Sequence, residues 1–236
     1  MREETRGGLT VRLTGGEDRE GGGEGPAVVL LHGFGAPGDD LVPLWRVIDV
    51  PEAVRFVFPE GPLALDANWP KARAWWMLDL ERLMSSQTPV RNVRVTPPGL
   101  ADARERLQTA LLELETSLNL SPHRMILGGF SQGAMLACDV VLRSPQSYAG
   151  LIILSGTLIA RDDWEALPPA RKGLPVFQSH GTRDPLLPFD MAQELRDLFT
   201  VHGLAVEWHE FEGGHEIPYH VLTQLGTFIR RTFQIS

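Results

Sequence analysis

Short apolar runs alternate with longer segments of helical periodicity along most of this chain. A continuous run such as Ala27–Leu31 has the length and composition of a strand that is buried on both faces. Between such runs, apolar residues recur at three- and four-residue spacing, which is typical of a helix with one buried face. The predicted strands are Leu9–Thr14, Ala27–Leu31, Val54–Phe58, Met125–Leu127, Gly150–Leu154, Pro175–Ser179 and Val206–Phe211. The predicted helices are Leu41–Ile48, a pattern from Pro98 that ends before Ser121, Gln132–Leu142, Met191–His202 and Pro218–Phe233.

The alternation predicts an α/β fold: a doubly wound, mostly parallel sheet with helices on both faces and function at the carboxyl ends of the strands. A length of 236 residues fits one domain, so we expect residues 1–236 to form a single unit. Residues 1–26 are expected to supply an N-terminal strand and a glycine-rich loop. The connection 158–173 is too short to form a large lid domain.

Residues 63–97 form a long excursion without clean periodicity. Trp75 and Trp76 lie in it, and two interpretations of these rings stay open. Long ordered loops often bind ligands, so the rings could wall an apolar substrate pocket. Tryptophan is also commonly buried for packing alone. Leu158 and Leu186, which follow later strands, are further candidates for contact with substrate.

A candidate nucleophile lies in the turn between the Met125–Leu127 strand and the next helix. The segment reads Gly129-Phe130-Ser131-Gln132-Gly133, and the glycines two residues on either side of Ser131 allow a tight strand-to-helix turn. The Gln132 N–H would lie at the positive end of the helix, where it can stabilise negative charge on an attacked carbonyl oxygen. A second such donor is needed, and the Phe34 N–H, after the strand Ala27–Leu31, is our candidate.

A serine hydroxyl needs a base and a group that orients the base, so the motif predicts an acid and a histidine further along the chain. Asp184 and His215 each lie just past a predicted strand, in the order nucleophile, acid, histidine that is typical of the α/β-hydrolase fold. We therefore predict a catalytic triad of Ser131, Asp184 and His215. The other histidines are placed less well for the role of base. Of these, His32 is expected to be structural, and His180 to pack beneath the site.

The composition limits which partners the protein could bind and in which compartment it could fold. The chain has 22 basic and 30 acidic side chains and a formal charge of -8, which argues against a nucleic-acid partner. A single cysteine, Cys138, forms no internal disulfide. The charged start is not a signal peptide and no apolar run is long enough to span a membrane, so a cytoplasmic protein is expected. No paired histidines or cysteines have metal-ligand spacing, and we expect no metal.

These motifs together resemble the phospholipase/carboxylesterase family, which includes the acyl-protein thioesterases. The resemblance spans about Ala27 to Phe233 and is carried by His32-Gly33-Phe34-Gly35, Gly129-Phe130-Ser131-Gln132-Gly133, His180-Gly181 with Asp184-Pro185 and Pro188, and Gly214-His215-Glu216-Ile217. It implies Ser131 as nucleophile, His215 as base, Asp184 as the orienting acid and the N–H groups of Phe34 and Gln132 as the oxyanion hole. It implies no cofactor.

Two departures from the thioesterase branch bear on the substrate. Phe34 is bulkier than the residue common in the family's first loop, and Trp76 with Met77 thickens a segment that resembles the substrate side of bacterial members. Both suggest a compact acyl pocket, so we expect a small-molecule ester of short to medium chain length. The alternatives are thioester or lysophospholipid hydrolysis with the same triad, and a non-catalytic binding protein on the same fold. The chain could be a monomer or a homodimer.

Overall fold

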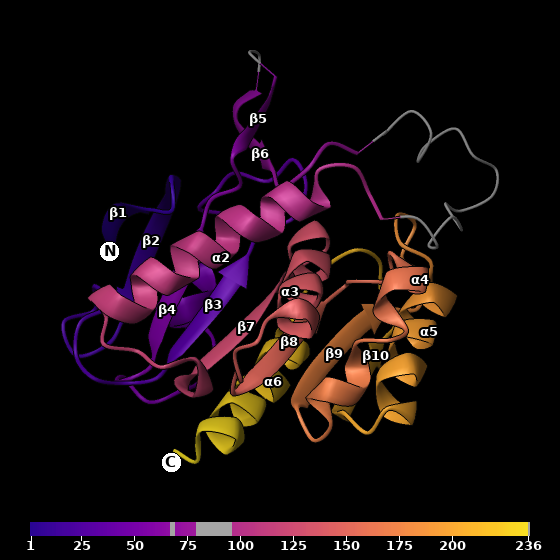
Figure 1. The fold of residues 1–236 in the computed structure, drawn as a ribbon. Helices are drawn as coiled ribbons and strands as arrows, with labels where there is room; N and C mark the ends of the chain where they lie inside the picture. The colour runs from indigo at the N-terminus through magenta and orange to yellow at the C-terminus, as the bar shows by residue number, and fades with distance from the viewer. Residues whose placement is uncertain (67–68, 79–95, 236) are drawn as a thin grey trace.

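A computed structural model describes residues 1–66, 69–78 and 96–235 (Figure 1). Its main sheet has eight strands in the order β1-β2-β4-β3-β7-β8-β9-β10. The six strands from β4 to β10 in this order are parallel, while β2 pairs antiparallel with β4 and with β1. The bounds are β1 Arg2–Arg6, β2 Leu9–Gly15, β3 Ala27–Leu31, β4 Arg55–Pro59, β7 Met125–Phe130, β8 Gly150–Leu154, β9 Pro175–Gly181 and β10 Ala205–Phe211.

Helices cover both faces of the sheet, which confirms the predicted fold class (Figure 1). Successive residues of β3 point into two separate cores: Val29 packs with residues of α2, α3 and α5, whereas Val28 and Leu30 pack with residues of α6. This alternation follows from the period of two along a strand. The helices are α2 Leu100–Ser117, α3 Gln132–Arg143, α4 Arg161–Trp164, α5 Phe189–Val201 and α6 Tyr219–Phe233, with 3₁₀ turns at Val42–Arg46, Pro122–Arg124 and Pro168–Arg171.

Three features differ from the sequence-based expectation. The N-terminus contributes two strands instead of one, because β1, Arg2–Arg6, pairs with β2. The expected helix at 41–48 is a 3₁₀ turn over Val42–Arg46. The excursion 63–97 begins with a hairpin of β5, Leu63–Asp66, and β6, Trp69–Ala74, that projects above the sheet (Figure 1). Residues 79–95 of the excursion lie outside the described part of the chain.

The parallel strands bring the segments that follow β3, β7, β8, β9 and β10 to one edge of the sheet. That edge holds the candidate nucleophile, acid and histidine, each on a different turn. In the part of the chain that the structure describes, no helix combines the length and apolar character needed to cross a membrane.

Candidate active site

Ser131 occupies a sharp turn between β7 and α3. Its backbone angles are φ 54° and ψ −118°, a conformation that a residue with a side chain rarely adopts. The flanking glycines explain how the turn packs. A Cβ on Gly133 would lie 2.1 Å from the Leu31 carbonyl oxygen, and one on Gly129 would lie 2.6 Å from the same oxygen. The two glycines therefore let the start of α3 lie directly against the end of β3, as their spacing predicts.

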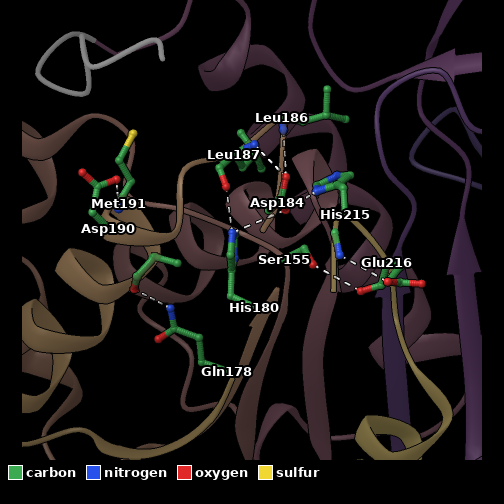
Figure 2. Close-up of polar contacts among 12 residues, drawn as sticks. Ser155, Gln178, His180, Asp184, Leu186, Leu187, Asp190, Met191, His215 and Glu216 are labelled. Atoms are coloured by element: carbon green, nitrogen blue, oxygen red, sulfur yellow. Dashed lines mark hydrogen bonds and ion pairs between the residues drawn. The ribbon is translucent and has the colours of Figure 1, made fainter. Parts of the chain in front are cut away.

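His215 and Asp184 meet at the same edge. The Nδ1 of His215 lies 2.7 Å from Oδ2 of Asp184, whose side chain is fully buried (Figure 2). The other carboxylate oxygen, Oδ1, accepts the N–H groups of Leu186 and Leu187, each at 2.9 Å. Because a carboxylate accepts, His215 donates from Nδ1 and leaves Nε2 free to accept a proton. This is the arrangement that a triad requires of its acid and base.

The environment keeps Asp184 ionised. Burial alone would raise the pKa of its carboxyl group, but the hydrogen bonds from His215 and from the Leu187 and Leu186 N–H groups outweigh burial and hold the pKa below its usual range. A charged carboxylate is the state that can hold a cationic imidazole after proton transfer.

His215 also lies next to the nucleophile turn. Its ring centroid is 4.7 Å from that of Phe130, the residue directly before Ser131. The histidine side chain is 13% exposed, so it is reachable from solvent while being held by its neighbours. The direct hydrogen bond from Ser131 Oγ to His215 Nε2 stays a prediction.

The two expected oxyanion donors come from neighbouring strands. Phe34 follows β3 and Gln132 opens α3, and β3 pairs directly with β7. A Cβ on Gly33, the residue before Phe34, would lie 3.4 Å from Ser131 Cβ, so the Phe34 loop runs beside the candidate nucleophile. Among the described residues, neither the Phe34 nor the Gln132 N–H donates to another group. Both are therefore available to an oxygen atom of a ligand.

The four candidate substrate contacts separate into two groups. Trp75, Trp76 and Leu158 are at most 2% exposed and belong to the core on the α2–α3 side of the sheet. Their burial favours packing over a pocket wall. Leu186 alone of the four is exposed, on the loop that carries Asp184. Met77, which was expected to thicken the pocket, is 60% exposed.

The remaining histidines of the site region follow the expectation. His32 is buried, with Nδ1 2.8 Å from the Gly33 carbonyl oxygen and Nε2 2.9 Å from the Gly61 N–H. His180 is fully buried beside Asp184, with Nε2 2.9 Å from the Leu187 carbonyl oxygen. Burial lowers the pKa of both imidazoles, so both are neutral.

One supporting residue was not anticipated. Ser155, buried directly after β8 with φ 49°, lies with its hydroxyl 3.4 Å from the Glu216 carbonyl oxygen (Figure 2). Glu216 in turn accepts the Gly214 N–H at 3.2 Å through Oε1. These contacts fix the His215 loop against the centre of the sheet. The sequence signal was a Ser-Gly pair at a strand end, which resembles many ordinary turns. Across the described residues, no three histidine, cysteine or acidic side chains cluster as metal ligands would.

The fold and the residues at this edge of the sheet define an α/β-hydrolase. The serine lies in a strained strand-to-helix turn after β7, and the acid and the histidine lie in the turns after β9 and β10. The model of the phospholipase/carboxylesterase family matches residues 20–233, and the chain belongs to that family of hydrolases. Similar curated proteins include the acyl-protein thioesterase 1 of Candida albicans, 29% identical over 217 residues that cover 86% of this chain and 90% of the relative. A probable carboxylesterase of Oryza sativa subsp. japonica is 27% identical over a match that covers 89% of this chain and 78% of the relative's length.

Solved structures agree with this assignment. The crystal structure of esterase PE8 is 27% identical and superimposes with a TM-score of 0.81, covering 95% of this chain and 99% of the other. A carboxylesterase from Mesorhizobium loti, 18% identical, has a TM-score of 0.71 with 94% of each chain covered. The second likeness concerns the fold alone.

Proposed function

We propose that the protein is a serine carboxylesterase that hydrolyses small esters of short to medium acyl chain length. Ser131 Oγ attacks the ester carbonyl carbon while His215 Nε2 takes its proton, and the N–H groups of Phe34 and Gln132 bind the resulting oxyanion. His215 then gives the proton to the leaving alcohol. Water, deprotonated by His215, attacks the acyl-enzyme and releases the acid and the free serine.

The hydrogen bond between His215 Nδ1 and the buried Asp184 carboxylate carries the proposal. It orients the imidazole with Nδ1 toward the carboxylate, beside the turn that holds Ser131, so that Nε2 is the nitrogen left to act as the base. A buried carboxylate that accepts three hydrogen bonds is costly to build for packing alone, because its charge must be fully compensated. Similarity to a protein named as an esterase and to one named as a probable carboxylesterase supports ester substrates.

The proposed chain length has narrower support. Of the three residues expected to make the pocket compact, Trp76 packs in the core and Met77 points to solvent. Phe34 is half-buried and directly follows Gly33, which lies beside Ser131, so it is the one of the three whose loop reaches the site.

The test compares wild type with Ser131→Ala on p-nitrophenyl esters from acetate to palmitate. We expect wild-type turnover that peaks at the short or medium esters and falls by several orders of magnitude in the variant. A peak at palmitate would overturn the chain length. An inactive wild type, or an equally active variant, would overturn the mechanism and favour a binding protein on this fold.

Thioester hydrolysis is a second candidate because several curated relatives are named acyl-protein thioesterases. The same triad serves both reactions, so geometry alone does not separate them. Matched S-acyl and O-acyl substrates of one chain length would, through the ratio of their kcat/KM values. A ratio strongly in favour of the S-acyl substrate would replace the ester assignment. A cytoplasmic location and a monomeric or homodimeric state remain predictions.

A further inference from the structure

Trp75 hydrogen-bonds to both segments that carry the proposed oxyanion donors. Its backbone N–H donates to Gln132 Oε1 at 3.0 Å, and its indole Nε1–H donates to the His32 carbonyl oxygen at 2.9 Å. Gln132 opens α3, whereas His32 lies two residues before Phe34. The Trp75 ring also packs on the His32 ring, with centroids 5.3 Å apart. All three side chains are at most 2% exposed.

We propose that Trp75 is a positioning residue that sets the distance between the two oxyanion donors. The inference rests on the proposed function, because it concerns the same oxyanion hole. Two N–H groups bind an oxyanion well only when both point at one position about 3 Å away. The donors belong to separate loops after β3 and β7, so a residue bonded to both loops constrains their separation.

The link to Gln132 is double. Its side-chain Nε2–H donates to the Trp76 carbonyl oxygen at 2.8 Å, while Oε1 accepts the Trp75 N–H. The amide of one buried side chain therefore clamps the backbone of two consecutive residues, through the N–H of Trp75 and the C=O of Trp76. Since the N–H of the same Gln132 is the proposed donor, the clamp limits rotation of that peptide.

The link to the Phe34 loop is reinforced by the strand that leads to Trp75. The Gly35 N–H donates to the Arg73 carbonyl oxygen at 2.8 Å, and the Arg73 N–H donates to the Ala36 carbonyl oxygen at 3.0 Å. The Arg73 side chain is held by Glu60, with Nε 2.7 Å from Oε1. Residues 73–76 therefore reach both donors, and Trp75 is the residue that contacts both sides.

A plain packing role for Trp75 is the alternative, and the neighbouring residue provides the control. Trp76 is as deeply buried and belongs to the same core. Its indole nitrogen has no hydrogen-bond partner among the described residues. Trp76→Phe thus measures the effect of the lost ring volume, whereas Trp75→Phe removes the same volume and also the bond to His32.

The experiment measures kcat and KM of wild type, Trp75→Phe and Trp76→Phe on the best p-nitrophenyl ester. A fluorophosphonate probe that labels Ser131 counts the competent sites. The inhibition constant of an alkyl trifluoromethyl ketone, whose carbonyl becomes an oxyanion when Ser131 Oγ adds to it, gives a second readout. We expect kcat of Trp75→Phe to lie about tenfold or more below that of Trp76→Phe, with the ketone weakened by a similar factor and KM little changed.

Equal kcat values and equal ketone affinities in the two variants, with an active wild type, would overturn the positioning role. An inactive wild type would overturn the proposed function and this inference with it, so the two failures are distinguishable. If Trp75→Phe does not fold, Gln132→Met leaves the His32 bond intact but breaks the other link, between Trp75 and α3, and it keeps the N–H of residue 132 in place. The same loss of kcat and of ketone affinity relative to Trp76→Phe is then expected, and its absence would overturn the inference.

Discussion

The imidazole Nε2 of His180 lies 3.4 Å from Oδ2 of Asp184, and both side chains are fully buried. The same Nε2 is 2.9 Å from the Leu187 carbonyl oxygen, so it carries a hydrogen. The Leu187 N–H in turn donates to Asp184 Oδ1 (Figure 2). His180 therefore holds the loop that presents the proposed acid, without reaching the serine turn by any contact that the described residues show.

Removing the His180 donor should loosen the Asp184 loop. His180→Leu removes the hydrogen bond to the half-buried Leu187 carbonyl oxygen, which costs about 1–3 kcal/mol of stability. We expect kcat/KM on the preferred ester to fall as well, because Asp184 loses its fixed orientation. His180→Gln is the matched control, since it keeps an N–H at a similar distance from the backbone. Urea unfolding and ester kinetics should show Gln close to wild type and Leu clearly impaired. Equal losses in the two variants would contradict the hydrogen-bonding role.

Buried neutral histidines should make the fold sensitive to mild acid. Burial lowers the pKa of His32 and of His180 below the ordinary value of 6.5. Below that value the unfolded chain takes up protons that the folded protein does not, so the free energy of unfolding falls as the pH drops. Each histidine contributes up to about 1.4 kcal/mol per pH unit between its unfolded and folded pKa. Asp184 acts at lower pH, because its depressed pKa adds stability that is lost only as a carboxylate is protonated.

Urea unfolding measured between pH 8 and pH 5 tests whether the buried histidines make stability depend on pH. We expect wild-type stability to fall over that range and the slope to be smaller in His32→Gln, which removes one of the two proton-uptake sites. His202, a histidine with no hydrogen bond to the core among the described residues, serves as the control through His202→Gln. A slope unchanged in His32→Gln would contradict the assignment of His32 as a buried neutral ring.

The strands of the sheet centre were predictable because burial on both faces leaves only apolar residues. β3 and β8 have the predicted bounds, Ala27–Leu31 and Gly150–Leu154. β1 was missed for the opposite reason. It is an edge strand, Arg2–Arg6, in which the half-buried positions Arg2, Glu4 and Arg6 are charged as well, so its sequence resembles a solvated terminus.

The candidate triad of Ser131, Asp184 and His215 stays a prediction. It could be proposed from the sequence because each residue follows a strand and their order matches one fold. The role of Trp75 could not be found. A buried tryptophan has the same sequence signature whether it lines a pocket or packs in a core, and its bonds to Gln132 and His32 join segments far apart in the chain. Such contacts depend on tertiary placement, which local pattern does not encode.

Asp139 is a buried charge that should control stability without touching the site. Its side chain is fully buried on α3 and lies 2.8 Å from Arg104 Nη1, 2.9 Å from Arg143 Nε and 2.8 Å from Trp164 Nε1. Asp139→Asn keeps the shape but removes the buried anion that Arg104 and Arg143 share, and among the described residues only Arg143 retains a second carboxylate, that of Asp163, at 3.1 Å. We expect a loss of about 3 kcal/mol or more in the free energy of unfolding.

Asp197→Asn is the surface control for this prediction. Asp197 pairs with the adjacent Arg196, but its side chain is 66% exposed. Such a pair contributes about 0–1 kcal/mol, so the control should unfold close to wild type in urea. A loss at Asp139 no greater than that at Asp197 would show that the buried charges rearrange without cost.

The backbone strain at Ser131 predicts an inverted ranking of alanine and glycine. The angles φ 54° and ψ −118° disfavour any side chain, and a non-glycine residue there costs about 1–3 kcal/mol. Glycine enters this region freely, so Ser131→Gly should be more stable than Ser131→Ala, although both lose the nucleophile. At a helical position the order is reversed, and Ala137→Gly within α3, where a buried methyl group is lost as well, should lose about 1 kcal/mol or more relative to wild type. Thermal unfolding of the three variants decides the matter. If the glycine variant at position 131 were less stable than the alanine variant, the turn would relax once the serine is removed. The fold itself would then not impose the strained backbone angles on residue 131.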